Sequence, residues 1–412
     1  MRPRRRVSQT TSSSQRRHRP DYWLVMIATV LMAIGLVVVY SISPWLSVKS
    51  QVSESYFVKK QLIVILLGIV AFLVTSNVSF RNWRKLTVPL AVISVLASAA
   101  LMVVGVKDKG AFRWIKVGGI SFQPAELIKF SVLIWLAGFL ADKFQSKQLD
   151  DYRSTLKPIL IMLTAVAIVV GKLQSDLGST MVIVAVVGAM IYVVGLPLRR
   201  ITMIAGVIAV AVVLLISGSS YRRARLATYL NPGKDCLTTG YQTCQALITV
   251  GSGGMFGLGL GRSVQAFGYL PEAANDSIFA IMAEKFGFVG TTFIIGLFAV
   301  LFTRIKWIVE RAPDAFSQLI ATGVLAWMTT QTIINIGAMI GLLPLKGITL
   351  PFISYGGTSI LFVCAAIGVV FHISRYTSYG LTAAENTRRV VDDHRSDRRR
   401  LRGAYHPNPG SR

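Results

Sequence analysis

The stretch Tyr269-Leu-Pro-Glu-Ala-Ala-Asn-Asp276-Ser-Ile-Phe-Ala-Ile-Met-Ala-Glu-Lys-Phe-Gly-Phe-Val-Gly290 turns from a polar loop into an apolar helix. From Asp276 to about Phe302 the chain is mostly apolar, which is long enough to cross a bilayer. Small residues recur at helical spacing between Asp276 and Gly287, so one face can pack closely against other helices. Asn275 and Asp276 are good N-cap residues, and on this segment alone a cap is favoured over a catalytic role for Asp276.

The composition is that of a membrane protein. Of the 412 residues, 53% are hydrophobic and 15% are charged. The net charge of +26 could indicate nucleic acid, but Lys and Arg are spread over loops and tails between apolar runs, which favours a membrane protein with no nucleic-acid partner. The first apolar run, Trp23 to about Ile42, is too long for a cleavable signal and is expected to stay as an anchor.

The apolar runs predict an all-α, polytopic membrane protein with about ten transmembrane helices. The expected spans lie near 22–43, 60–76, 87–106, 125–142, 157–171, 178–196, 201–217, 277–303, 316–340 and 353–374. The basic tails, 1–20 and 376–412, are expected to be disordered, which leaves 21–375 as the membrane domain. With the N-terminus inside, inner segments carry about twice as many Lys and Arg as outer loops. Both termini are therefore expected in the cytoplasm, and the large loop 218–275 on the outer face.

Ionisable residues at membrane depth are expensive and usually functional. Glu126 and Lys129 stand three residues apart at the start of the fourth span, so they share a helix face and can pair. A salt bridge that fastens two helices and a substrate contact are equally compatible with this spacing. Asp176 precedes the sixth span, where it could be an N-cap or a second acidic group in a cavity.

Cations gather on the predicted outer face, where positive charge is normally avoided. Arg222, Arg223 and Arg225 open the long loop, and Arg suits bidentate binding of phosphate, so an anionic ligand is favoured over a solvated basic face. Arg113 lies in an aromatic, basic segment that is expected at the membrane interface, where it could bind a phosphate headgroup or simply anchor the chain. Lys346 could likewise reach a phosphate or be an ordinary exposed lysine.

The rest of the long loop favours structural roles. Residues 240–245 predict an amphipathic helix lying on the membrane. Six glycines in residues 251–261 favour a re-entrant turn over a close approach to a ligand, and no Gly-Lys-Ser/Thr follows to make a P-loop. Cys236 and Cys244 could form a disulfide in an oxidising compartment. No cluster of His, Cys and Asp has zinc-site spacing.

Taken together, these segments resemble the SEDS family of polytopic glycosyltransferases, and the resemblance covers nearly all of 22–375. It rests on Gln123-Pro-Ala-Glu126-Leu-Ile-Lys129, Gln174-Ser-Asp176-Leu-Gly, Tyr221-Arg-Arg-Ala-Arg225, Leu230-Asn-Pro, Gly240-Tyr-Gln242, Gly251-Ser-Gly-Gly, Tyr269-Leu-Pro-Glu-Ala, Asp276 and Leu350-Pro-Phe-Ile-Ser354-Tyr-Gly-Gly. The motif Lys346-Gly-Ile-Thr-Leu-Pro resembles the division branch of the family rather than the elongation branch. The chain departs from the family pattern at Ser175, Ala273–Asn275, Ser277 and Lys285.

The resemblance implies an enzyme that polymerises lipid II, the lipid-linked peptidoglycan precursor, at the outer face of the cytoplasmic membrane and at the division septum. It implies Asp276 as the base for the acceptor hydroxyl. The residues expected to bind substrate are Arg113, Gln123, Glu126, Lys129, Asp176, Arg222, Arg223, Arg225, Gln242, Lys346 and Ser354. A divalent cation, Mg²⁺ or Mn²⁺, could assist the departing pyrophosphate and would be held by Asp276.

The implied partners are a class B penicillin-binding transpeptidase (FtsI-like) and a division regulatory complex (FtsQLB-like). A lipid II flippase, an elongation-type polymerase and a non-catalytic scaffold are the alternative functions. The polar loops are concentrated on the predicted outer face, and neither half of the chain clearly repeats the other, as the halves of many transporters do. Both observations favour outer-face chemistry over transport.

Overall fold

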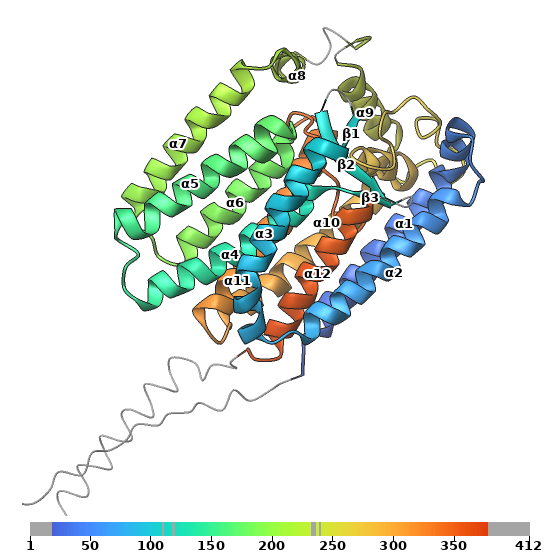
Figure 1. The fold of residues 1–412 in the computed structure, drawn as a ribbon. Coiled ribbons are helices and arrows are strands. Elements are labelled where there is room, and N and C mark those ends of the chain that lie inside the picture. Colours follow the sequence, from blue (N-terminus) through green and yellow to red (C-terminus); the bar gives the residue numbers. More distant parts are fainter. Residues whose placement is uncertain (1–18, 109–110, 118–119, 232–235, 239, 378–412) are drawn as a thin grey trace, which may run out of the picture.

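The computed structural model describes residues 19–108, 111–117, 120–231, 236–238 and 240–377, which form a bundle of long helices (Figure 1). The long helices are α1 (Tyr22–Ser50), α2 (Tyr56–Asn77), α3 (Phe80–Val104), α4 (Pro124–Gln145), α6 (Leu177–Val193), α7 (Leu198–Ser217), α10 (Ile278–Glu310), α11 (Ala315–Met339) and α12 (Gly357–Ser374). The fifth span is a composite of η1 (Tyr152–Leu156), α5 (Lys157–Val166) and η2 (Ala167–Leu173), in which two π-helical stretches flank an α-helix.

The predicted spans are confirmed as helices. Among the described residues, eight helical segments are long and apolar enough to cross a membrane, and α6 is a shorter apolar helix between them. The remaining predicted span corresponds to α7, which has 20 residues and lies at one edge of the bundle in Figure 1. The predicted tails 1–20 and 376–412 lie almost wholly outside the described residues.

Polar contacts fasten the end of the bundle where α1 begins and α12 finishes. Asp21 caps α1 by accepting from the backbone of Trp23, and its carboxylate accepts from Arg304 of α10 at 2.6 and 2.8 Å. The backbone N–H of Asp21 donates to Ser374 of α12. We call this the terminal end, and the opposite end, which carries α8 (Ser220–Leu230) and α9 (Tyr241–Ser252), the loop end (Figure 1).

A small sheet at the loop end is the only strand structure among the described residues. The strands β1 (Val106–Asp108), β2 (Ala111–Val117) and β3 (Ile120–Phe122) pair antiparallel in the order β1-β2-β3. This sheet includes Arg113 and covers the segment that the sequence places at the membrane interface. Aromatic and β-branched residues such as Phe112, Trp114 and Ile115 suit a strand as well as an interface, so both structures fit the same pattern.

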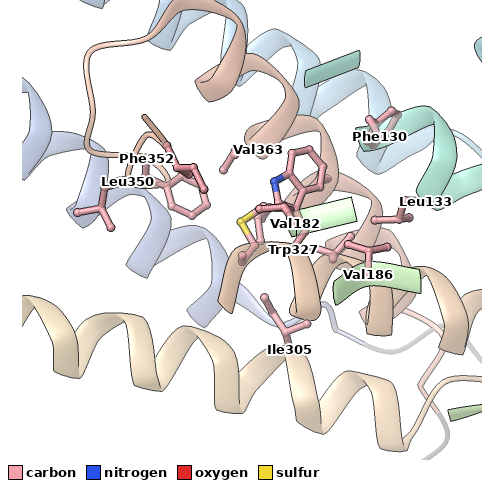
Figure 2. Packing of buried hydrophobic residues seen from close by; sticks show 14 of the residues in the cluster. Phe130, Leu133, Val182, Val186, Ile305, Trp327, Leu350, Phe352 and Val363 are labelled. Atoms are coloured by element: carbon pink, nitrogen blue, oxygen red, sulfur yellow. The ribbon is translucent and has the colours of Figure 1, made fainter. Parts of the chain in front are cut away.

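The core of the bundle is centred on α11. Trp327 is fully buried, and Figure 2 shows it among Phe130 and Leu133 of α4 and Val182 and Val186 of α6. Because α11 is enclosed by α4, α6 and α10, any polar side chain on it must find partners inside the protein. Gln331 and Asn335 are two such buried side chains.

The structure corrects the prediction of one unbroken helix across 277–303. Gly287 has φ 67° and ψ −168°, so α10 is broken there into a short piece at the loop end and a longer piece that runs toward the terminal end. The glycine-rich segment packs against this break: Leu258 N–H donates to the carbonyl of Glu284 at 2.8 Å, and Phe288 N–H donates to that of Gly254 at 2.9 Å. Its glycines therefore let two backbones approach each other, a structural role that differs from both the re-entrant turn and the ligand contact considered from the sequence.

Candidate functional site

Asp276 lies at the loop end, one residue before Ser277, the N-cap of α10. The N-cap residue is Ser277 and not Asn275 or Asp276, so the predicted cap role for Asp276 is wrong by one residue. The Ser277 hydroxyl donates to the carbonyl of Pro271 at 2.9 Å and accepts from the Gln242 amide at 3.3 Å. Gln242, predicted to bind substrate, thus joins α9 to the start of α10.

The Asp276 carboxylate faces the turn between α11 and α12. A Cβ placed on Gly347 would lie 3.2 Å from Asp276 Oδ2, so the carboxylate is in contact with the residue next to Lys346. Gly347 has φ +66°, a conformation that a residue with a side chain adopts only with strain. The turn can therefore bring Lys346 beside Asp276 because its neighbour is glycine.

Four of the predicted cations come together at this end. Arg225 donates to the carbonyl of Leu345 at 3.0 Å, Arg222 to that of Gly171 at 2.6 Å, and Arg113 to those of Gln174 and Ser175 at 3.3 and 3.1 Å. Burial lowers the pKa of Lys346, and the charges of Arg225 and Arg222 lower it further. Burial also lowers the pKa of Arg222, with a contribution from Arg113.

Arg225 bonds to the residue next to Lys346, and Arg222 and Arg113 bond to the neighbouring segment 171–175, so we call Arg113, Arg222, Arg225 and Lys346 the cationic cluster. Half-buried like charges at close range repel one another, and an anion between them would relieve that repulsion. Arg223, the remaining predicted cation of α8, is exposed. The arrangement suits an anionic ligand bound mainly by the first four residues.

Gln123 and Asp176 form a hydrogen-bonded pair at the start of α6, next to the cluster. Asp176 caps α6, accepting from the backbone of Ser179 at 2.8 Å, and it also accepts from the Gln123 amide at 3.1 Å. The cap alternative for Asp176 is therefore confirmed. Gly178, at the start of α6, packs closely against the turn between α11 and α12. A Cβ on Gly178 would lie 2.5 Å from Ile348 Cγ1 and 3.1 Å from the Lys346 carbonyl. The start of α6 thus presses against the turn that carries Lys346.

The predicted pair of Glu126 and Lys129 is confirmed as an ion pair inside the bundle. The Lys129 ammonium lies 2.8 Å from Glu126 Oε1, and the two residues are 3% and 4% exposed. Lys129 also donates to Gln331 Oε1 at 3.2 Å and lies 5.2 Å from the centre of the Trp327 ring. This burial favours the fastening role over direct contact with a substrate.

Ser354 holds the turn rather than facing an open site. It is buried, donates to the carbonyl of Asn275 at 2.8 Å and accepts from the backbone of Leu350 at 2.7 Å. The backbone of Tyr355 adds a bond to the carbonyl of Ala274 at 2.8 Å. The segment that leads to Asp276 and the turn that carries Lys346 are therefore one connected unit.

Two residues of α11 that sequence reasoning missed take part in this unit. Gln331 donates to the carbonyl of Thr349 at 2.9 Å, and Asn335 donates to the carbonyls of Asp276 and Ile348, both at 2.7 Å. The signal that could have found them is the spacing of two amides four residues apart in a predicted membrane span, where polar groups are expensive.

The large loop contains the predicted disulfide between Cys236 and Cys244, which ties the segment before α9 to α9 itself. A small cavity of about 30 Å³ opens between α8, α9 and the turn 343–345, lined in part by Arg225, Tyr229 and Gln242. That volume suffices for about one water molecule.

The described residues offer few ligands for a metal ion. Within the described parts of the chain, no group of three or more His, Cys, Asp or Glu side chains could hold a metal ion. Asp276 is a single carboxylate of the kind that Mg²⁺ accepts, but a cation there would need most of its ligands from substrate and water. The side chains in the described part of the chain do not by themselves make a metal site, and no catalytic step is assigned to a metal.

Comparison with known proteins identifies the family. A family model described as "Cell cycle protein", which unites FtsW, RodA and SpoVE, matches residues 22–379. The chain therefore belongs to this family, which is the SEDS family that its motifs indicate.

Individual relatives match over most of their length. Stage V sporulation protein E of Bacillus subtilis is 39% identical over 87% of this chain and 98% of its own. The probable peptidoglycan glycosyltransferase FtsW of Coxiella burnetii is 38% identical over 87% of this chain and 96% of its own. A chain of a solved peptidoglycan synthase complex that coordinates polymerization and crosslinking is 26% identical, with a TM-score of 0.72 over 86% of this chain and 98% of its own.

Proposed function

We propose that this protein is a peptidoglycan glycosyltransferase that polymerises lipid II at the outer face of the cytoplasmic membrane. The observation that carries the proposal is the contact of the Asp276 carboxylate with Gly347, beside Lys346 and its cationic cluster. A base next to a group of cations is what transfer of a sugar from a pyrophosphate requires. The relatives named as glycosyltransferases support the same reaction.

The reaction follows from these two elements. The 4-hydroxyl of the acceptor N-acetylglucosamine attacks the anomeric carbon of the growing strand, and Asp276 takes the hydroxyl proton as the new glycosidic bond forms. The bond from the anomeric carbon to the undecaprenyl pyrophosphate breaks. The electron pair leaves with the pyrophosphate, whose charge is stabilised by Arg113, Arg222, Arg225 and Lys346.

The finer biological setting is part of the proposal. We place both termini in the cytoplasm and the loop end outside, because this orientation puts the excess of Lys and Arg inside. A class B transpeptidase is the expected partner, since the related solved chain belongs to a complex that couples polymerization to crosslinking. Action at the division septum, under a division regulatory complex, is supported by the FtsW names among the relatives.

The test is polymerisation of labelled lipid II by the purified protein with its transpeptidase in vesicles. Asp276→Asn should abolish polymer formation while the melting temperature stays near that of the wild type. Glu54→Gln, which changes an exposed acidic residue at the same end of the bundle, is the matched control and should remain within about threefold of wild type. Normal polymer yield from Asp276→Asn would remove Asp276 from the mechanism.

The same vesicles separate the enzyme from a transporter. Lipid II that crosses the membrane without forming polymer would indicate a flippase, and neither crossing nor polymer, with the transpeptidase present, would indicate a scaffold. The concentration of cations and Asp276 at one end of the bundle favours polymer formation.

A further inference from the structure

Two buried amides lie one helical turn apart on α11 and contact the turn between α11 and α12. Gln331 and Asn335 are 0% and 2% exposed. Gln331 donates to Thr349, while its oxygen accepts from Lys129 at 3.2 Å and from Trp327 at 2.7 Å. Gln331 therefore links the turn to Lys129 of the interior ion pair.

Asn335 is placed differently, because its one amide nitrogen holds two segments at once. Nδ2 donates to the carbonyl of Asp276 and to the carbonyl of Ile348, each at 2.7 Å. Asp276 is the proposed base, and Ile348 is two residues after Lys346. Ser354 and Tyr355, farther along the turn, bond instead to Asn275 and Ala274, which precede Asp276. Asn335 is thus the side chain that bridges the backbone of Asp276 itself to the segment of the turn that carries Lys346.

The oxygen of the same amide supports a role beyond packing. Asn335 Oδ1 is buried and has no hydrogen-bond partner among the described residues. An unsatisfied buried acceptor is unfavourable and rare in native proteins, so an apolar residue would suit this position better if packing were its only task. The two bonds that Nδ2 donates offset the cost of the unsatisfied oxygen.

We infer that Asn335 is a positioning residue that sets the separation between the Asp276 carboxylate and the Lys346 ammonium. The effect on rate rests on the proposed function, but the effect on the two backbone segments does not. Misplacement of a reacting group by about 1 Å can cost roughly 100-fold in rate, so loss of this bridge should act on the chemical step.

The first experiment measures lipid II polymerisation by Asn335→Leu, which removes both donors at similar volume. We expect kcat to fall by about 30- to 100-fold while KM for lipid II changes by less than about threefold. Asn335→Asp, which keeps the shape but replaces the donors with acceptors, should be equally defective. Thr332→Val is the matched control, because the Thr332 hydroxyl on the same helix is buried without a hydrogen-bond partner, and it should stay within about twofold.

The second experiment uses hydrogen–deuterium exchange and needs no substrate. Asn335→Leu should speed exchange of backbone amides in both 274–277 and 346–350, whereas Gln331→Leu should speed exchange in 346–350 alone. Should Asn335→Leu fail to fold, Asn335→Ser, which keeps one donor, should give intermediate changes in kcat and exchange.

The outcomes distinguish the two proposals. Unchanged exchange at 274–277, or a kcat equal to wild type, would overturn the positioning role of Asn335. Altered exchange at both segments in a protein whose Asp276→Asn variant still polymerises lipid II would leave the bridge standing and refute the assignment of Asp276 as the base.

Discussion

The interior pair of Glu126 and Lys129 and the cluster around Lys346 place their charges in opposite ways. In the interior, two charges of opposite sign meet at 2.8 Å under almost complete burial. At the loop end, charges of one sign lie together, half-buried, and donate to backbone carbonyls. The first arrangement neutralises itself and fastens α4 within the bundle. The second gathers cations beside the Asp276 carboxylate under partial burial, so the neighbours and the burial of a lysine, rather than its residue type, distinguish the two settings.

The largest effect is expected from breaking the interior pair. Lys129→Met leaves the Glu126 carboxylate buried without its partner and should lower the free energy of unfolding by about 3–5 kcal/mol. The measurement is denaturant unfolding of the purified protein in detergent. The double variant Glu126→Leu/Lys129→Met, which removes both charges, should recover most of this loss. A double variant no more stable than the single one would show that the pair does more than fasten helices.

A smaller effect, on activity alone, is expected at the cluster. Arg225→Ala should lower kcat/KM for lipid II by about 10- to 100-fold, because a charge-assisted bond to phosphate contributes roughly 1.5–3 kcal/mol. The melting temperature should change little. Arg223→Ala removes an exposed arginine from the same helix and should stay within about twofold. Equal losses from both variants would mean that α8 acts only through its general charge.

The smallest effect is a shift in pH dependence. Because burial and the charges of Arg225 and Arg222 lower the pKa of Lys346, this lysine should lose its proton, and its hold on pyrophosphate, at a lower pH than an ordinary lysine. The alkaline decline of kcat/KM should move to higher pH in Arg225→Gln, which removes one repelling charge, and should disappear in Lys346→Arg. Arg223→Gln, the control, should leave it in place.

The same lowered pKa has a defined sign for stability. Between the folded and the unfolded pKa of Lys346, the folded state binds fewer protons than the unfolded state, so the contribution of this lysine to stability rises with pH across that window. Unfolding measured over this range should show the rise in wild type and a smaller one in Lys346→Met. A fall in stability across the window would contradict the direction of the shift.

Sequence reasoning was strongest where one physical property decides the structure. Apolar length located the spans, and the excess of arginine in the long loop indicated the cluster. The break at Gly287 could not be predicted, because a lone glycine is tolerated in a helix and only the contact with the segment at Gly254 stabilises the break. The role of Asn335 could not be predicted, because a neutral amide in an apolar span does not indicate its partners. Only the fold brings its Nδ2 to the carbonyls of Asp276 and Ile348.

The Cys236–Cys244 disulfide bears on how the protein is made. The cysteines are only eight positions apart in the sequence, so the thiols can meet without the distant helices. Such a bond forms only where the surroundings are oxidising. In the orientation proposed above, a ribosome-bound chain could cross-link this loop soon after it reaches the outer face, while the C-terminal helices are still being synthesised. In a reducing host, newly made protein would assemble its helices but leave α9, with Gln242, less firmly anchored.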